Sequence, residues 1–83
     1  MSAEPESAVT LDATGLMCPL PVLKARKALK ALQAGACLRV LATDPASVID
    51  FRHFCDVTDN QLVEHAESDG VFTYLIRKGG RAG

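Results

Sequence analysis

The chain has 83 residues, of which 9 are Lys or Arg and 10 are Asp or Glu, so its formal net charge is −1. This length allows one small domain, no apolar run approaches the roughly 20 residues that span a bilayer, and the start is polar and acidic, unlike a secretory or organellar signal. Three Cys at irregular spacing argue against a disulfide framework, so we expect a protein of the reducing cytoplasm.

The charge is distributed unevenly along the chain. Residues 1–12 carry −3 and residues 13–43 carry +5 with no acidic residue, whereas residues 44–70 carry −6 and residues 71–83 carry +3. A net charge near zero therefore hides one basic and one acidic block, and it does not by itself exclude an anionic partner.

The first half of the chain predicts a strand, a helix and a second strand. Residues 9–13 alternate as in a half-buried strand, which Gly15 ends. A helical pattern runs from Pro19 to about Gln33, and the early prolines are tolerated because the first helical turn has unpaired N–H groups. Residues 37–43 form a mostly apolar segment that predicts a central strand.

The second half predicts a helix and a hairpin. Asp44 is expected as the N-cap, with Pro45 as the first residue of a helix that ends near Phe54. Residues 61–68 and 71–77 alternate as strands, and the Asp-Gly pair between them is a strong signal for a tight hairpin turn.

The element order is thus strand, helix, strand, helix, strand, strand. Right-handed crossovers place both helices on one face of the sheet, which predicts an α/β (α+β) two-layer sandwich with a four-stranded mixed sheet. We expect a single domain over residues 9–78, with a disordered extension at residues 1–8 and a flexible tail at residues 79–83.

The segment around Cys18 is the part of the sequence that points to chemistry. Cys18 precedes the first helix, where free amide groups, the helix dipole and nearby basic residues are expected to lower the pKa of the thiol modestly. A dithiol oxidoreductase commonly has a resolving thiol three residues later, but Pro21 is found there. This spacing favours a group carrier that holds a persulfide until a partner's thiol attacks it, with a packed loop cysteine as the alternative.

Six short segments resemble one known family. Leu11–Ala13 and the Gly15–Pro21 segment, with its Cys-Pro-x-Pro motif, are similar to the signature of the TusA/SirA-like sulfur carriers. The resemblance continues through Arg26-Lys27, Thr43–Pro45, Phe54-Cys55 and Leu75–Gly80, so it covers about residues 10–80.

The resemblance implies a sulfurtransferase of the carrier type with the same two-layer fold. It implies that Cys18 accepts sulfane sulfur as a persulfide from a cysteine desulfurase or a rhodanese-like donor, and that Gly15, Pro19 and Pro21 shape its loop. The sulfur would pass to the next protein of a relay, leading to 2-thiouridine in tRNA or to dissimilatory sulfur oxidation. Neither a metal nor an organic cofactor is implied.

The first helix also carries a candidate docking surface for such partners. On a helical wheel the apolar Leu23 lies among Arg26, Lys27 and Lys30, one turn from Cys18. A simply solvated basic face is the alternative. Asp44 belongs to the same surface if the first two strands are parallel, although helix capping explains it equally well. We expect a monomer.

Three further readings concern other parts of the chain. The basic helix could bind RNA or serve a regulatory domain without sulfur transfer, but no aromatic residue is interleaved with its cations. The Gly79-Gly80 pair resembles the thiocarboxylate tail of ubiquitin-like sulfur carriers, but it is not terminal. Cys37 is expected in the core, and Cys55 either in the core or in a secondary redox role.

Overall fold

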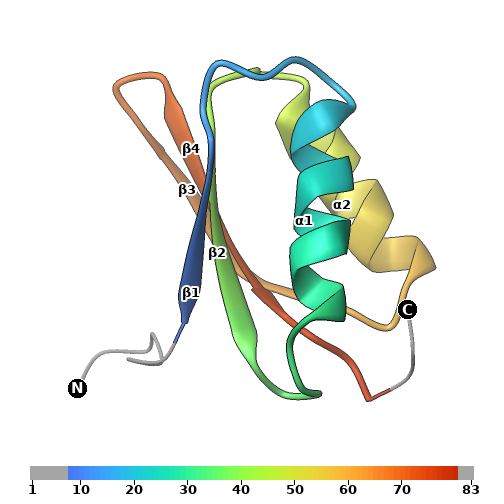
Figure 1. Ribbon diagram of the computed structural model, residues 1–83. Helices are drawn as coiled ribbons and strands as arrows, with labels where there is room; N and C mark the ends of the chain where they lie inside the picture. Colours follow the sequence, from blue (N-terminus) through green and yellow to red (C-terminus); the bar gives the residue numbers. More distant parts are fainter. Residues whose placement is uncertain (1–7, 81–83) are drawn as a thin grey trace.

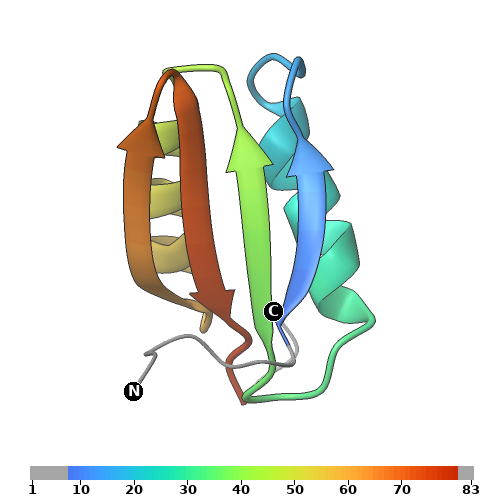
Figure 2. The ribbon, with the colours of Figure 1, turned by 90° about the vertical axis from the view of Figure 1, so that its left-hand side faces the viewer.

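Two helices and four strands make up the computed structural model, which describes residues 8–80. The elements follow in the order β1 (Val9–Ala13), α1 (Leu20–Lys30), β2 (Cys37–Ala42), α2 (Ser47–Val57), β3 (Gln61–Ser68) and β4 (Val71–Arg77). Both helices lie on the same face of the sheet (Figure 1), and the opposite face carries no helix (Figure 2). The predicted two-layer α+β sandwich is confirmed.

The sheet is mixed, with the strand order β1-β2-β4-β3. β1 pairs with β2 in parallel, whereas β4 is antiparallel to both β2 and β3. Because β1 and β2 are parallel, the loops that follow them, residues 14–19 and 43–46, lie at the same end of the molecule (Figure 1). We call this end the thiol end, since it holds Cys18.

The β3–β4 hairpin has the tight turn that the sequence predicts. Asp69 and Gly70 have positive φ angles of 51° and 82°, and Ser68 pairs directly with Val71. Two consecutive residues with positive φ give the mirror-image turn whose twist matches that of the flanking strands, and Asp and Gly are among the residues that adopt it at low cost.

Helix α1 is shorter than the sequence predicts. Pro19 is its N-cap and Lys30 its last residue, so the predicted end near Gln33 is wrong. The amides of Ala31 and Leu32 bond to carbonyls only three residues back, in a tightened last turn that stops the α-helical pattern. The apolar spacing that predicted the helix continues through this turn, which is why the sequence overestimates its length.

Helix α2 begins and ends later than predicted. Its first residue is Ser47 and its N-cap is Ala46, so the prediction of Asp44 as N-cap is wrong. The Ser47 amide bonds to the Asp44 carbonyl oxygen at 2.9 Å, which makes residues 44–47 a turn that precedes the helix. The helix ends at Val57 rather than near Phe54.

The core lies between the sheet and the helices. Leu38, Val40 and Ala42 of β2 are fully buried, as alternation in a half-covered central strand requires. The rings of Phe51 from α2 and Tyr74 from β4 stack with their centroids 4.5 Å apart. This packing fixes α2 on the sheet and so sets the position of its first turn at the thiol end.

The two ends of the chain lie beyond the residues that the structure describes. Residues 1–7 of the expected N-terminal extension and residues 81–83 of the expected tail lie outside the described residues. Within residues 8–80, neither helix is long and apolar enough to cross a membrane.

Candidate functional site

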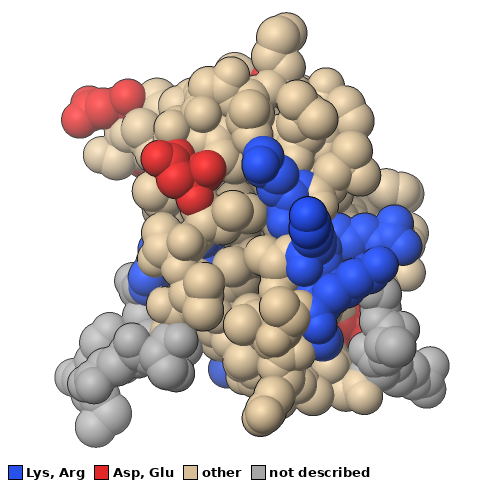
Figure 3. All heavy atoms as spheres, in the orientation of Figure 1, with Lys and Arg blue, Asp and Glu red and all other residues tan. Residues whose placement is uncertain are grey.

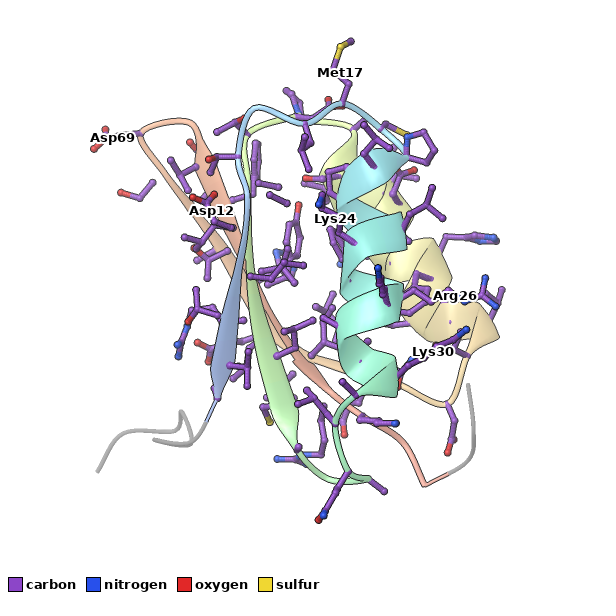
Figure 4. The ribbon with its side chains drawn as sticks, in the orientation of Figure 1. Asp12, Met17, Lys24, Arg26, Lys30 and Asp69 are labelled. Carbon is purple, nitrogen blue, oxygen red and sulfur yellow. The ribbon has the colours of Figure 1, made fainter. Side chains whose placement is uncertain are left out.

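Cys18 lies in the loop between β1 and α1, and its side chain is exposed. Met17, the next residue back, marks this loop at the top of Figure 4. Two of the residues expected to shape the loop help to anchor it: Pro21 is buried in the first turn of α1, and the Gly15 amide donates a hydrogen bond to the Thr43 Oγ1 atom at 2.9 Å. Gly15 has a φ of 80°, a backbone conformation that residues with a side chain rarely adopt.

Asp44 joins the two loops of the thiol end. Its Oδ2 atom accepts a hydrogen bond from the Cys18 amide at 2.7 Å, and its Oδ1 atom accepts one from the Ala46 amide at 3.0 Å. These bonds, the one from Cys18 above all, lower the pKa of the Asp44 carboxyl group. The expectation that Asp44 lies at the same end as Cys18 is therefore confirmed, and both of its carboxylate oxygens are engaged with backbone amides.

A second carboxylate, that of Asp50, lies within hydrogen-bonding reach of the Cys18 thiol. This hydrogen bond is the largest cause of a raised thiol pKa, to which desolvation and the charges of Asp50 and Asp44 add. The sequence predicts the opposite direction, and that prediction is wrong because the Asp50 carboxylate of α2, followed by desolvation, disfavours the thiolate.

Asp50 is the residue of this site that sequence reasoning missed. It lies in the first turn of α2. Parallel pairing of β1 and β2 brings the beginnings of both helices to one end of the sheet, so an acidic residue in that turn is a candidate neighbour of Cys18. The sequence therefore contains a signal for Asp50, but it does not show whether the Asp50 side chain points toward Cys18.

The predicted docking residues of α1 are all on the surface. Leu23 is 51% exposed, and Arg26, Lys27 and Lys30 are exposed as well. Figure 3 shows Lys and Arg side chains gathered over α1, and Figure 4 labels three of them on the helix. Arg39, which belongs to the same basic block of the sequence, lies on β2 and not on this helix.

Large apolar side chains are also exposed at the thiol end. Met17 and Ile49 are 73% and 74% exposed, and Leu20 is 46% exposed. They belong to the Cys18 loop, to the first turn of α2 and to the beginning of α1. An exposed thiol is therefore accompanied by apolar surface on these elements and by the basic face of α1, a combination that suits contact with another protein.

Comparison with known proteins assigns this chain to a family. The family model described as Sulfurtransferase TusA matches residues 9–78. The chain belongs to this family. It is 53% identical over 68 residues, 82% of this chain and 90% of the relative, to the sulfur carrier protein TusA of Allochromatium vinosum. It is 52% identical over 68 residues, with 82% and 92% coverage, to a putative sulfur carrier protein of Neisseria meningitidis serogroup A.

A solved structure agrees with this assignment. The crystal structure of a SirA-like protein from Desulfitobacterium hafniense superposes with a TM-score of 0.75 at 34% identity, covering 86% of this chain and 97% of that one. The resemblance to the TusA/SirA-like proteins, stated above on short segments of sequence, is thereby confirmed.

The other two cysteines of this TusA family member differ from Cys18 in their surroundings. Cys37 is buried on β2, with 5% of its surface exposed, as predicted for a core residue. Cys55 is partly buried in α2 and lines a shallow surface pocket of about 550 Å³. Burial, with a smaller contribution from Asp56, raises the pKa of Cys55 to about 11, so its thiol stays protonated near neutral pH.

The alternative sites find less support in the structure. Gly79, placed in the tail by the sequence, packs against Asp59, and its amide donates a hydrogen bond to the Asn60 Oδ1 atom at 3.1 Å. It is therefore held against the domain rather than extended as a thiocarboxylate arm would be. Over residues 8–80, no group of three or more His, Cys, Asp or Glu side chains could hold a metal ion.

RNA binding through base stacking also lacks its usual side chains. Phe51, Phe54 and Tyr74 are buried, and Phe72 is partly buried. These are all the aromatic residues of the chain, so the basic face of α1 has no exposed ring on which a base could stack.

Proposed function

We propose that this protein carries sulfane sulfur as a persulfide on Cys18 within a sulfur relay. The observation that carries the proposal is an exposed thiol on a loop of a TusA family member, with the other two cysteines withdrawn into β2 and α2. A carrier must present its sulfur to two partners in turn, and an accessible thiol without a resolving cysteine meets that requirement.

The transfer needs no oxidant. The Cys18 thiolate attacks the outer sulfur of a donor persulfide, the donor's S–S bond breaks, and the donor cysteine leaves as a thiolate that takes up a proton. In the second transfer an acceptor thiolate attacks the outer sulfur of the Cys18 persulfide. The S–S bond breaks, and Cys18 leaves as a thiolate that takes up a proton. The donor is a cysteine desulfurase or a rhodanese-like protein, and the acceptor is the next protein of a pathway to thiolated tRNA or of sulfur oxidation.

The loading experiment tests this proposal directly. The protein is incubated with a cysteine desulfurase and Cys, or with a rhodanese-type donor and thiosulfate, and its intact mass is recorded. We expect a gain of one sulfur atom in the wild type and in Cys55→Ser, and none in Cys18→Ser. The proposal is wrong if Cys18→Ser gains the same mass, or if the wild type gains none from either donor.

Partner docking is assigned in this proposal to Leu23, Arg26, Lys27 and Lys30, with Asp44 holding the Cys18 loop beside them. Opposite charge speeds the encounter of two proteins and is weakened by salt. The single reversals Arg26→Glu and Lys27→Glu should therefore slow loading by the donor, more at low salt than at high salt. Arg77→Glu is the matched control, because Arg77 is exposed on β4. Equal loading rates in all three variants would rule out docking on this face.

A further inference from the structure

The carboxylate of Asp50 is a feature of the thiol end that the proposed function leaves without a role. Its Oδ2 atom is buried, and in the part of the chain that the structure describes no group donates a hydrogen bond to it. A buried acceptor without a donor is costly and uncommon in folded proteins. This oxygen therefore has the capacity to bind a proton donor.

The Cys18 thiol is a candidate for this donor. The thiol lies within hydrogen-bonding reach of the carboxylate, and it sits on a loop, whereas Asp50 sits on a helix fixed to the sheet. Phe51, the next residue of α2, is fully buried and stacks on Tyr74, so the backbone that carries Asp50 is held in place.

Asp44 is the other carboxylate whose charge acts on the thiol, but both of its oxygens already have hydrogen-bond donors. Its two oxygens accept the backbone amides of Cys18 and Ala46, so it anchors the loop rather than the sulfur. Asp50 also lies close enough to Tyr74 to act on that hydroxyl electrostatically, but the Tyr74 hydroxyl is paired with Ser47 at 2.7 Å. Of the two carboxylates, Asp50 is therefore the one that can accept a hydrogen bond from the sulfur on Cys18.

We propose that Asp50 is the positioning residue of the sulfur carried by Cys18. Its carboxylate accepts the S–H of the thiol in the empty carrier, and its Oδ2 atom, which has no donor in that state, accepts the S–H of the outer sulfur in the loaded carrier. The proposal rests on the proposed function for the loaded state, whereas its statement about the empty state stands by itself.

The proton balance of sulfur uptake follows from this placement. As the Cys18 sulfur attacks the donor's outer sulfur, its proton passes to the Asp50 carboxylate and the donor's S–S bond breaks. The donor cysteine leaves with the electron pair of that bond and takes the proton from Asp50, while the new outer sulfur keeps its own hydrogen. A thiol and a persulfide give a persulfide and a thiol, so no oxidant or reductant is consumed.

The arrangement also restrains the empty carrier. A carboxylate beside the thiol disfavours the thiolate, so Cys18 should react slowly with small electrophiles at neutral pH despite its exposure. Sulfur transfer would then require the partner to be bound and oriented, which suits a carrier that must not lose its cargo site to solvent oxidants.

The first test measures iodoacetamide alkylation of Cys18 from pH 6 to pH 11 by peptide mass spectrometry. In Asp50→Asn the midpoint of the rate profile should fall, and the rate at pH 7 should rise roughly three- to tenfold. Asp56→Asn, at the other end of α2, removes the same charge and should leave the profile unchanged, and Asp50→Glu should return it toward the wild type. An unchanged profile in Asp50→Asn overturns the proposal.

The second test uses the unaltered protein, so it does not depend on how a variant folds. With 13C-labelled Asp, the carboxyl resonance of Asp50 should shift at the pH at which Cys18 titrates, and again when sulfur is loaded from a desulfurase and Cys. Absence of the first shift overturns the proposal. If the first shift occurs but neither donor loads sulfur, the proposed function fails while the contact between Asp50 and the thiol stands.

Discussion

The two ends of the helical layer differ in how their polar groups are bonded. At the end away from Cys18, which we call the capped end, the Lys78 Nζ atom donates to the carbonyl oxygen of Leu32 at 2.6 Å, and Gly79 bonds to Asn60. At the thiol end neither helix has a side-chain cap bond, and Asp50 keeps a buried oxygen without a donor. The comparison teaches that side chains bond the polar groups at the capped end, whereas beside the thiol Asp44 is fully engaged and one buried oxygen of Asp50 is left without a donor.

The same comparison separates two cysteines whose pKa values are both raised. For Cys55 the cause is burial, whereas for Cys18 it is first a neighbouring carboxylate. A raised pKa caused by burial comes with loss of access, but one caused by a carboxylate leaves the sulfur exposed and can be reversed when that carboxylate is neutralised or engaged.

Alkylation should show the largest contrast between the ends. At pH 8 the native wild type should be modified by iodoacetamide at Cys18 about a hundredfold faster than at Cys55, because the Cys55 thiol is both partly buried and almost fully protonated. Peptide mapping after timed quenching gives both rates, and urea-unfolded protein is the control, in which the rates should converge. Comparable rates in the native protein would contradict the contrast.

The next effect concerns stability at the capped end. In Gly79→Ala the added Cβ would overlap the Asp59 backbone carbonyl, which must then shift, so the free energy of unfolding should fall by about 2–3 kcal/mol. Gly80→Ala is the matched control, since nothing lies near that position, and it should stay within about 0.5 kcal/mol of the wild type. Urea unfolding followed by circular dichroism compares the two; equal stabilities would show that Gly79 is not packed.

How far the sequence determines this contrast differs between fold and site. The element order follows from strand alternation and from glycine and proline at the breaks, and the placement of both helices on one face of the sheet follows from the crossover rule. The helix ends do not follow from the sequence. The turns at Ala31 and at Asp44 are closed by hydrogen bonds between residues three apart, and these turns differ only slightly in energy from a continued α-helix.

The site follows the same division. Cys18 and the basic face of α1 are visible in the sequence because each depends on local spacing. The direction in which the Cys18 pKa shifts is not visible in the sequence. Its largest cause is Asp50, which is distant in sequence and acts on the thiol only once α2 has packed on the sheet. Local rules for helix N-termini therefore gave the wrong sign at the residue where a tertiary contact matters most.

A smaller effect is expected just below the thiol end, where Ser47 and Tyr74 share a buried hydrogen bond of 2.7 Å. Ser47→Ala leaves the buried tyrosine hydroxyl without this partner and should lower the free energy of unfolding by about 1–2 kcal/mol. Tyr74→Phe in the Ser47→Ala background should cost less than it does alone. Thermal melts of the two single variants and the double variant complete this cycle, and strictly additive losses would mean that the bond contributes nothing.

The smallest effect is a pH dependence at Asp44. Its folded pKa lies below the ordinary value because its carboxylate accepts the amides of Cys18 and Ala46, so it stabilises the fold fully above the unfolded pKa, and this contribution is lost as the pH falls through the folded pKa. The wild type should therefore lose its stability advantage over Asp44→Asn as the pH is lowered below about 4. Urea melts between pH 3 and pH 7 measure this difference. Asp69→Asn, which removes the same charge from the exposed hairpin turn, corrects for the change in net charge. A difference between the wild type and Asp44→Asn that stays constant with pH would show that the bond from Asp44 to the Cys18 amide does not hold the sulfur-bearing loop in solution.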